Sequence, residues 1–255
     1  MDLLASPAFW ASLATLTFLE IVLGIDNLLF VSIAVGKLKG AEQERARRIG
    51  IWGAMGLRIV MLAGIFWIIN LDKHPLFELS PSLAPLFGKD GEHAEAFLQV
   101  TVKDLILFAG GLFLLWKGTQ EIHQTVEGTH HEETAAPATY TSVVIQLFVI
   151  NFVFSLDSVI TAVGMTDILP VMIAAVVLST VVMAFASKPL ATFIEAHPTT
   201  KMLALAFILL VGVALIADSA GFHIPRGYLY FAIAFSLGVE LLNIRARRKA
   251  GPATH

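Results

Sequence analysis

The sequence has no cysteine and few charged residues. Without Cys among its 255 residues, the chain cannot form a disulfide, a thiolate zinc site or a thiol nucleophile. Charged residues make up 15% of the chain, whereas an ordinary soluble domain has about 25%. The net charge of −3 gives no basic footprint for nucleic acid. These shortages exclude a disulfide-bonded scaffold, a nucleic-acid-binding protein and an ordinary soluble enzyme.

The chain is instead rich in long apolar runs. Hydrophobic residues make up 56% of it, and its mean hydropathy is +0.77. A helix of about 20 apolar residues spans a bilayer and satisfies its own backbone hydrogen bonds in lipid. We therefore predict an all-α membrane protein with seven transmembrane helices, at about residues 8–36, 49–70, 104–122, 141–164, 169–187, 200–217 and 227–244.

Basic residues predict how these helices are oriented. Lys and Arg concentrate in the first predicted connection, at residues 37–48, and in the tail, at residues 245–249. Cytoplasmic loops carry an excess of Lys and Arg, and seven helices place these two segments on one side. We therefore expect an amino terminus outside the membrane and a carboxyl terminus in the cytoplasm.

A polar motif occurs twice in the apolar sequence. The segment LEIVLGIDNLL, which begins at residue 19, aligns without a gap with INFVFSLDSVI, which begins at residue 150. Glu20 then corresponds to Asn151, and Asp26 corresponds to Asp157. Each half holds three predicted helices, and an odd number inserts the second copy upside down. Inverted repeats are characteristic of secondary transporters, which bind substrate near the membrane midplane between the repeats.

The repeat predicts a simple domain organisation. We expect one transmembrane domain over residues 1–255, with repeat one at about 8–122 and repeat two at about 141–217. A last helix follows at about 227–244. The two longest connections are an outer loop at residues 71–102 and an inner loop at residues 123–139. Neither is long enough for a further domain.

The acidic residues of the motif lie deep within predicted helices. An Asp at a helix centre costs about 2.5–3.5 kcal/mol on the insertion scale, so each carboxylate needs a compensating partner. A bound cation, Arg58 and protons are the candidates. Carboxylate, amide and carbonyl oxygens suit Mg²⁺, Ca²⁺ or Mn²⁺. The predicted metal ligands are Glu20, Asp26, Asn27, Asn151 and Asp157, with Arg58 as their candidate charge partner.

Geometry leaves alternatives open at this site. Glu20 and Asp26 would point about 120° apart on a straight helix. An unwound turn at Gly24, and its equivalent at Ser155, would turn them toward one point. Arg58 is expected to pair with the aspartates as a stand-in cation. The aspartates could equally be structural, and Glu20 or Asn151 could simply hydrogen-bond two helices together.

Other features have simpler interpretations. The spacing of Gly50, Gly53 and Gly56, and the adjacent pair Gly110 and Gly111, predict close helix packing. Lys188 is expected to extend to the membrane surface. We interpret Glu121 as an interfacial charge at the end of a membrane-spanning helix. The His- and Glu-rich connection at about 123–139 reads as a solvated linker, with metal gathering as its alternative.

Three segments together resemble a known family. They are LEIVLGIDNLLFVSIAVGKL from residue 19, NFVFSLDSVITAVGMTD from residue 151 and HIPRGYLYFAIAFSLGVELLN from residue 223. They closely resemble the TerC family of integral membrane proteins, in the short bacterial branch without CBS domains. The resemblance implies a seven-helix fold related to the LysE transporter superfamily, export of divalent metal, mainly manganese, and a link to tellurite resistance.

These observations predict a divalent metal cation exporter, chiefly for Mn²⁺, that works by alternating access. A cation needs ionised ligands, so binding releases protons and proton coupling is the natural hypothesis. The expected partners are the transported metal ion and the lipid bilayer, with no tightly bound cofactor and no nucleic acid. One alternative is a non-transporting scaffold in metal or tellurite stress resistance. The other is a membrane enzyme, which we do not expect because the sequence shows no nucleophile–base pair.

Overall fold

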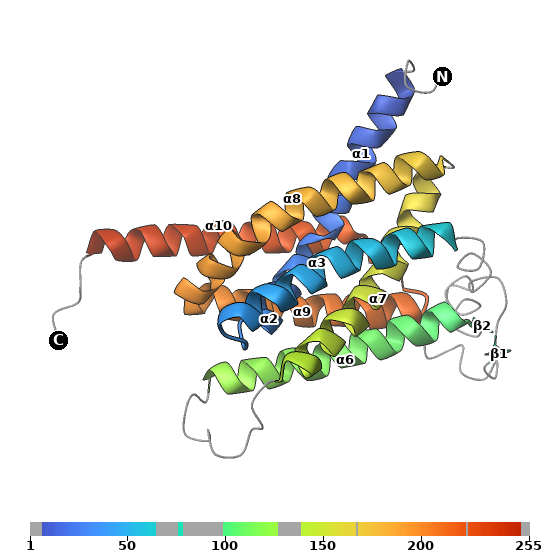
Figure 1. Cartoon of the computed structure of the whole chain (residues 1–255). Helices are drawn as coiled ribbons and strands as arrows, with labels where there is room; N and C mark the ends of the chain where they lie inside the picture. Colours follow the sequence, from blue (N-terminus) through green and yellow to red (C-terminus); the bar gives the residue numbers. More distant parts are fainter. Residues whose placement is uncertain are drawn as a thin grey trace.

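The computed structural model describes residues 7–64, 76–78, 99–126, 139–166, 168–222 and 224–250, and these are almost entirely helical (Figure 1). The prediction of an all-α membrane protein is confirmed. The exception is a short antiparallel pair, β1 (Phe77–Glu78) with β2 (Gln99–Val100), within the predicted outer loop. The helices are α1 (Pro7–Leu23), α2 (Ile25–Val35), α3 (Gly40–Ala63), α6 (Val102–Val126), α7 (Tyr140–Met165), α8 (Leu169–Ala196), α9 (Pro198–Ser219) and α10 (Arg226–Ala250).

Among the described residues, six helical segments are long and apolar enough to cross a membrane. They are α1 with α2 as one unit, then α6, α7, α8, α9 and most of α10. The helix α3 matches the predicted second span, but its first turns carry charged residues such as Glu44 and Arg48. The start of α1 and the end of α10 lie at opposite ends of the bundle (Figure 1), as the predicted seven crossings, with α3 as one of them, require.

The end of the fifth predicted span is wrong. The sequence predicts that this helix stops near residue 187, ahead of Pro189, whereas α8 continues to Ala196 with the proline inside it. Proline removes one backbone hydrogen bond, but neighbouring helices can support it within a bundle. Lys188 is exposed, and its extension to the membrane surface stays a prediction.

Each of the main helix–helix contacts joins a helix of the first half to a helix of the second half, as expected for an inverted repeat. The most extensive contacts pair α1 with α8, α3 with α7, and α6 with α9. At the α6–α9 crossing, a β-carbon added to Gly111 would lie 2.7 Å from Gly212 O and 2.7 Å from Ile216 Cγ1. Conversely, a β-carbon on Gly212 would lie 3.1 Å from Gly111 O and 3.2 Å from Leu115 Cδ2. This reciprocal contact is what an internal two-fold axis would produce; the repeat boundaries themselves stay a prediction.

The glycines do not all serve packing. A β-carbon on Gly50 would lie 3.1 Å from Leu147 Cδ1, and one on Gly110 would lie 2.5 Å from Val153 Cγ1. Close packing is therefore confirmed at these two positions. It is wrong for Gly56, where an added β-carbon would meet no atom of another described element within 4 Å. A spacing of three does not say which face of a helix meets a neighbour.

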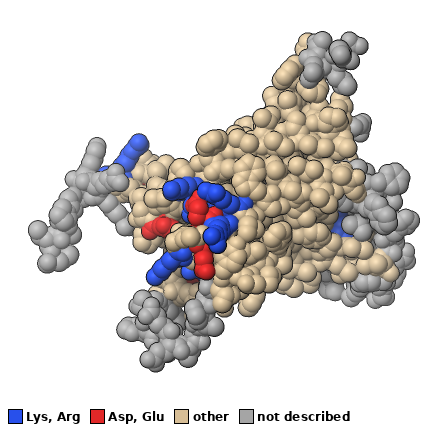
Figure 2. Space-filling model, in the orientation of Figure 1, with Lys and Arg blue, Asp and Glu red and all other residues tan. Residues whose placement is uncertain are grey.

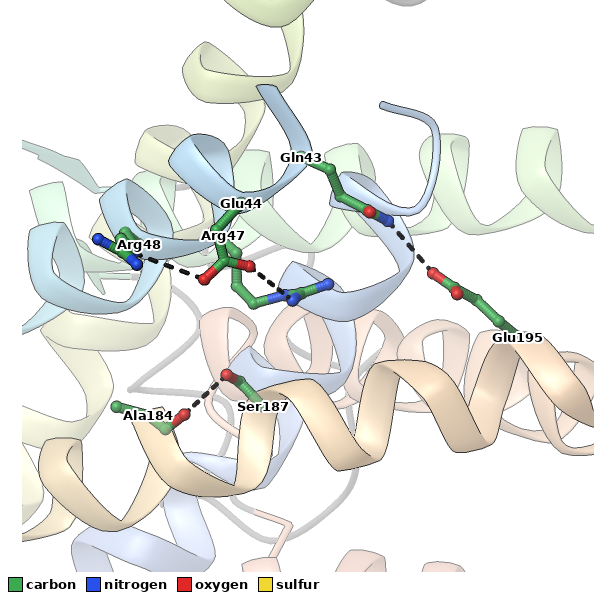
Figure 3. A network of polar contacts seen from close by, with 7 residues as sticks. All are labelled: Gln43, Glu44, Arg47, Arg48, Ala184, Ser187 and Glu195. Atoms are coloured by element: carbon green, nitrogen blue, oxygen red, sulfur yellow. Dashed lines mark hydrogen bonds and ion pairs between the residues drawn. The ribbon is translucent and has the colours of Figure 1, made fainter. Parts of the chain in front are cut away.

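Charged side chains gather at one end of the bundle (Figure 2). Glu44 accepts a hydrogen bond from Arg47 Nη1 at 3.1 Å and pairs with Arg48 Nε at 3.5 Å (Figure 3). Gln43 Nε2 donates to Glu195 Oε1 at 3.3 Å and so links α3 to α8. We call this the charged end, defined by Lys37, Gln43, Glu44, Arg47, Arg48, Glu121 and Glu195.

Candidate functional site

A buried ion pair joins the first helix to α3. Arg58 Nη1 donates to Glu20 Oε2 at 2.7 Å, and the two side chains are only 1% and 2% exposed. Glu20 lies on the last turn of α1, and Arg58 lies on the core-facing side of α3. Breaking a buried pair by removing one partner costs about 3–5 kcal/mol, because the other charge is left uncompensated. The sequence predicts that Arg58 pairs with the aspartates, whereas the described ion pair joins it to Glu20.

The first spanning helix is interrupted beside this pair. The helix α1 ends at Leu23 and α2 begins at Ile25, so Gly24 alone separates them. Gly24 keeps a helical conformation (φ −87°, ψ −8°), its N–H donates to Glu20 O at 2.9 Å, and its carbonyl accepts from Leu28 N at 2.9 Å. The predicted break is therefore present but is not an unwound turn. The prediction of an equivalent break at Ser155 is wrong, because α7 runs through that residue without interruption.

Glycine at the interruption lets α8 approach closely. A β-carbon on Gly24 would lie 2.3 Å from Met183 Sδ and 3.1 Å from Met183 Cε. Met183 is itself buried. It also lines a small cavity with Asn27, Val31 and Gly50. Nothing in the sequence marked Met183, because an apolar residue within a spanning helix carries no signal of its depth or its neighbours.

Asp26 and Asn27 begin α2 and are both buried, at 5% and 4% exposure. A carboxylate in the first turn of a helix is favoured by the positive end of the helix dipole. The cavity next to Asn27 has a volume of about 10 Å³, close to the least that holds one water molecule. The interior at this point therefore has polar groups and a small amount of space.

Asn151 performs the structural role that the sequence left open. Its Nδ2 donates to Gly50 O at 2.9 Å, so it ties α7 to α3. Within the described part of the chain, its Oδ1 has no hydrogen-bond partner, and the same is true of Asn27 Oδ1 and Ser155 Oγ. Buried polar atoms are nearly always satisfied, so a group of unsatisfied oxygens needs an explanation. Oxygen atoms of this kind are ligands for hard cations.

The remaining predicted ligand is placed only by its backbone. Asp157 lies in α7, six residues after Asn151, but its side chain is outside the described residues. Its role as a ligand stays a prediction. The described residues hold no group of three His, Cys, Asp or Glu side chains that could bind a metal. The described part of the site thus consists of two carboxylates, from Glu20 and Asp26, with amide and hydroxyl oxygens.

Two other predictions have different outcomes. Most of the His- and Glu-rich connection, residues 127–138, lies outside the described residues, so neither interpretation of it is tested. Glu121, expected as a simple charge at a helix end, pairs with Lys37 instead, and its side chain is only 12% exposed. The two partners are 84 positions apart, and no local pattern joins them.

Comparison with known proteins shows the family of the chain, but the names of its relatives state no substrate. The model described as "Integral membrane protein TerC family" matches residues 5–251. The "UPF0053 inner membrane protein YgdQ" of Escherichia coli is 44% identical over 246 residues, which cover 96% of this chain and 97% of that protein. A "UPF0053 protein" of Haemophilus influenzae is 46% identical over 247 residues, with the same coverage.

A longer relative shows that the same region also occurs within larger proteins. The "UPF0053 inner membrane protein YoaE" of Escherichia coli is 44% identical over 250 residues, which are 97% of this chain but only 45% of that protein. No solved structure matches the chain.

Proposed function

The chain belongs to the integral membrane protein TerC family, and from this membership and its buried polar site we propose that it exports divalent metal cations, with Mn²⁺ as the main substrate. The names of the relatives state a membrane location and no substrate. The choice of a divalent metal is supported by the oxygen ligands. The choice of manganese and of export rests on the resemblance of the paired motifs to the family.

One observation carries the proposal: a carboxylate–guanidinium pair, and several side-chain oxygens without a hydrogen-bond partner among the described residues, are buried inside the same bundle of membrane-spanning helices. Glu20 and Arg58 are almost fully buried. Within the described residues, Arg58 Nε and Nη2 have no hydrogen-bond partner. An arginine that serves only as a fixed structural group generally uses more of its five N–H donors. Ionisable groups within membrane helices commonly mark ion pathways.

The pair suggests how the site remains neutral when empty. In the state described here, the guanidinium compensates the Glu20 carboxylate. A divalent cation that binds Glu20, Asp26, Asn27, Asn151 and Asp157 would replace Arg58 as the counter-charge. Exchange of one cation for another avoids leaving a bare carboxylate in low dielectric, which is the expensive state. Arg58 would then return as the metal leaves.

Alternating access would come from the two repeats. The contacts α1–α8 and α3–α7 each join one repeat to the other, so rocking of the repeats would move Arg58 on α3 relative to Asn151 on α7. Such motion around a fixed central site is the usual mechanism of inverted-repeat transporters. Protons that bind the carboxylates in place of metal are the proposed counter-ions.

We place the protein in the bacterial inner membrane, where its relatives YgdQ and YoaE are named. The charged end contains the α2–α3 connection and the end of α8, and α10 also ends with basic residues. An excess of Lys and Arg marks the cytoplasmic side. The charged end and the carboxyl terminus would thus be cytoplasmic, and the start of α1 would be outside.

Purified protein in liposomes tests the proposal. Mn²⁺, Mg²⁺, Ca²⁺ and Zn²⁺ would each be offered on one side, and uptake measured with a metal-sensitive dye. We expect protein-dependent Mn²⁺ flux that exceeds Zn²⁺ flux and is abolished by Glu20→Gln. Absence of flux for every ion, from protein that is folded and inserted, would favour the alternative of a non-transporting scaffold in metal or tellurite stress.

A further inference from the structure

A second carboxylate–base pair lies at the charged end. Lys37, in the connection between α2 and α3, forms an ion pair with Glu121 near the end of α6. The side chains are 26% and 12% exposed, so the pair is partly protected from water. Lys117 is also within electrostatic range of Glu121 and Lys37, but its Nζ donates to Gln120 Oε1 at 3.0 Å and lies 4.8 Å from the Trp116 ring centre.

Glu121 also lines a small cavity inside the bundle. Residues of α2, α6, α7 and α9 surround this cavity, which has a volume of about 10 Å³. Its polar walls come from Lys117, Glu121 and Gln146, and Ala34 and Phe30 of α2 form an apolar wall. A carboxylate, an amide and a small space thus meet at Glu121, the residue with which Lys37 pairs.

The helix α2 links this cavity to the central site. Asn27 and Ala34 are seven residues apart, so they lie on nearly the same face of α2 and about 10 Å apart along its axis. Asn27 and Val31 line the cavity at the central site, whereas Phe30 and Ala34 line the cavity at Glu121. The two cavities therefore follow one another along α2, with the buried Phe30 and Val31 side chains at the junction.

We propose that the Lys37–Glu121 ion pair is a gate at the charged end, and that Glu121 is the first carboxylate that a cation meets when Lys37 moves away. This inference rests on the proposed function. It repeats the arrangement of the central site, where Arg58 occupies Glu20 until a cation replaces it. The outer pair is more exposed than the inner one, and access to water weakens an ion pair, so this pair should open more readily than the pair at the central site. Lys37 sits in a connection between helices, where movement requires no change inside a helix.

The absence of cysteine allows a direct test of the gate. The substitution Ala34→Cys supplies a single thiol on the cavity wall of an otherwise unchanged chain. Its rate of reaction with a membrane-impermeant maleimide, added from the charged end, measures how often the gate is open. Lys37→Gln or Glu121→Gln in this background should raise that rate about tenfold. The charge-reversed double variant Lys37→Glu/Glu121→Lys should restore a rate near that of the parent.

Arg48→Gln is the matched control. It breaks a pair at the same end of the bundle, but Arg48 and Glu44 are 73% and 46% exposed and line neither of the two cavities along α2. The labelling rate should then stay within twofold of the parent. Unchanged labelling in both Lys37→Gln and Glu121→Gln would overturn the gate. Because labelling does not depend on transport, raised labelling without Mn²⁺ flux in the parent would support the gate and overturn only the proposed function.

Flux measurements separate the carboxylate from its partner. If Glu121 receives the cation, Glu121→Gln should raise the KM for Mn²⁺ about tenfold while Lys37→Gln leaves it unchanged or lowers it. Equal effects of the two variants on KM would overturn the role of Glu121 and leave the pair as a structural contact.

Discussion

Gly24 and Met183 lie so close together that a single methyl group would not fit between them, since a β-carbon on Gly24 would lie 2.3 Å from Met183 Sδ. The contact brings α8 against the interruption between α1 and α2. The atoms involved are at the end of a flexible side chain, so Met183 can move. The available space is the cavity that Met183 shares with Asn27.

This contact predicts a variant that affects transport more than stability. Gly24→Ala should change the free energy of unfolding by less than about 1 kcal/mol, because Met is adaptable and Ala favours helix. The displaced Met183 side chain should fill the space beside Asn27 and reduce Mn²⁺ flux severalfold. Flux in liposomes and thermal unfolding in detergent measure the two effects. Recovery of flux in Gly24→Ala/Met183→Ala would support the explanation, and failure to recover would refute it.

The α6–α9 crossing predicts the opposite result. A β-carbon on Gly111 would meet Gly212 O at 2.7 Å, and a backbone atom cannot move aside as a side chain can. Gly111→Ala should therefore destabilise the fold by about 1–3 kcal/mol, the usual cost of overpacking. Gly56→Ala is the matched control, since a β-carbon there would meet no neighbouring element within 4 Å in the part of the chain that the structure describes. Equal unfolding temperatures for these two variants would contradict the close crossing.

The two buried asparagines should differ in what they contribute. Asn151→Leu removes the hydrogen bond to Gly50 O, and a bond between membrane helices is worth about 0.6 kcal/mol on average. Asn27→Leu removes an oxygen that has no hydrogen-bond partner among the described residues. Both variants should weaken Mn²⁺ binding, but Asn151→Leu alone should also lower stability. Calorimetric titration and unfolding curves measure the two effects, and Mn²⁺ affinity unchanged in both would remove the asparagines from the site.

Orientation gives a fourth prediction. A reporter protein that is active only in the cytoplasm, fused after residue 255, should be active in cells. The reason is the excess of Lys and Arg at the charged end and in the tail. The same reporter fused before Met1 should be inactive. Reversed activities would place the gate at Lys37 and Glu121 on the outer side of the membrane.

The sequence predicts the helices well because each one is a local property. Apolar runs placed most of the spanning helices within a few residues. The exceptions are the start of α3, at Gly40 rather than near residue 49, the end of α8, where Pro189 is tolerated inside the helix, and the end of α10. Burial of Glu20, Asp26, Asn27 and Asn151 also followed from their depth within those runs. Depth depends on position along a single helix, and a sequence shows that directly.

Contacts between helices could not be predicted in the same way. Arg58 pairs with Glu20, and Lys37 pairs with Glu121, only because of how α1, α3 and α6 pack in space. Such packing depends on which apolar side chains face a neighbouring helix. The sequence does not distinguish these from the apolar side chains that face lipid. Met183 shows the limit, since its contact with Gly24 is decided by the α1–α8 crossing and leaves no mark in the sequence.

The central claim is that Arg58 and a metal cation compete for Glu20, and Mn²⁺ binding by two single variants tests it most directly. Glu20→Gln keeps the shape of the side chain and removes its charge, so we expect Mn²⁺ affinity to fall at least tenfold, and flux with it. Arg58→Gln removes the competitor, so affinity should be retained or increase while flux falls. Calorimetric titration of both variants, beside the parent protein, gives the answer. Normal Mn²⁺ affinity in Glu20→Gln, or loss of affinity in Arg58→Gln from folded protein, would contradict the account.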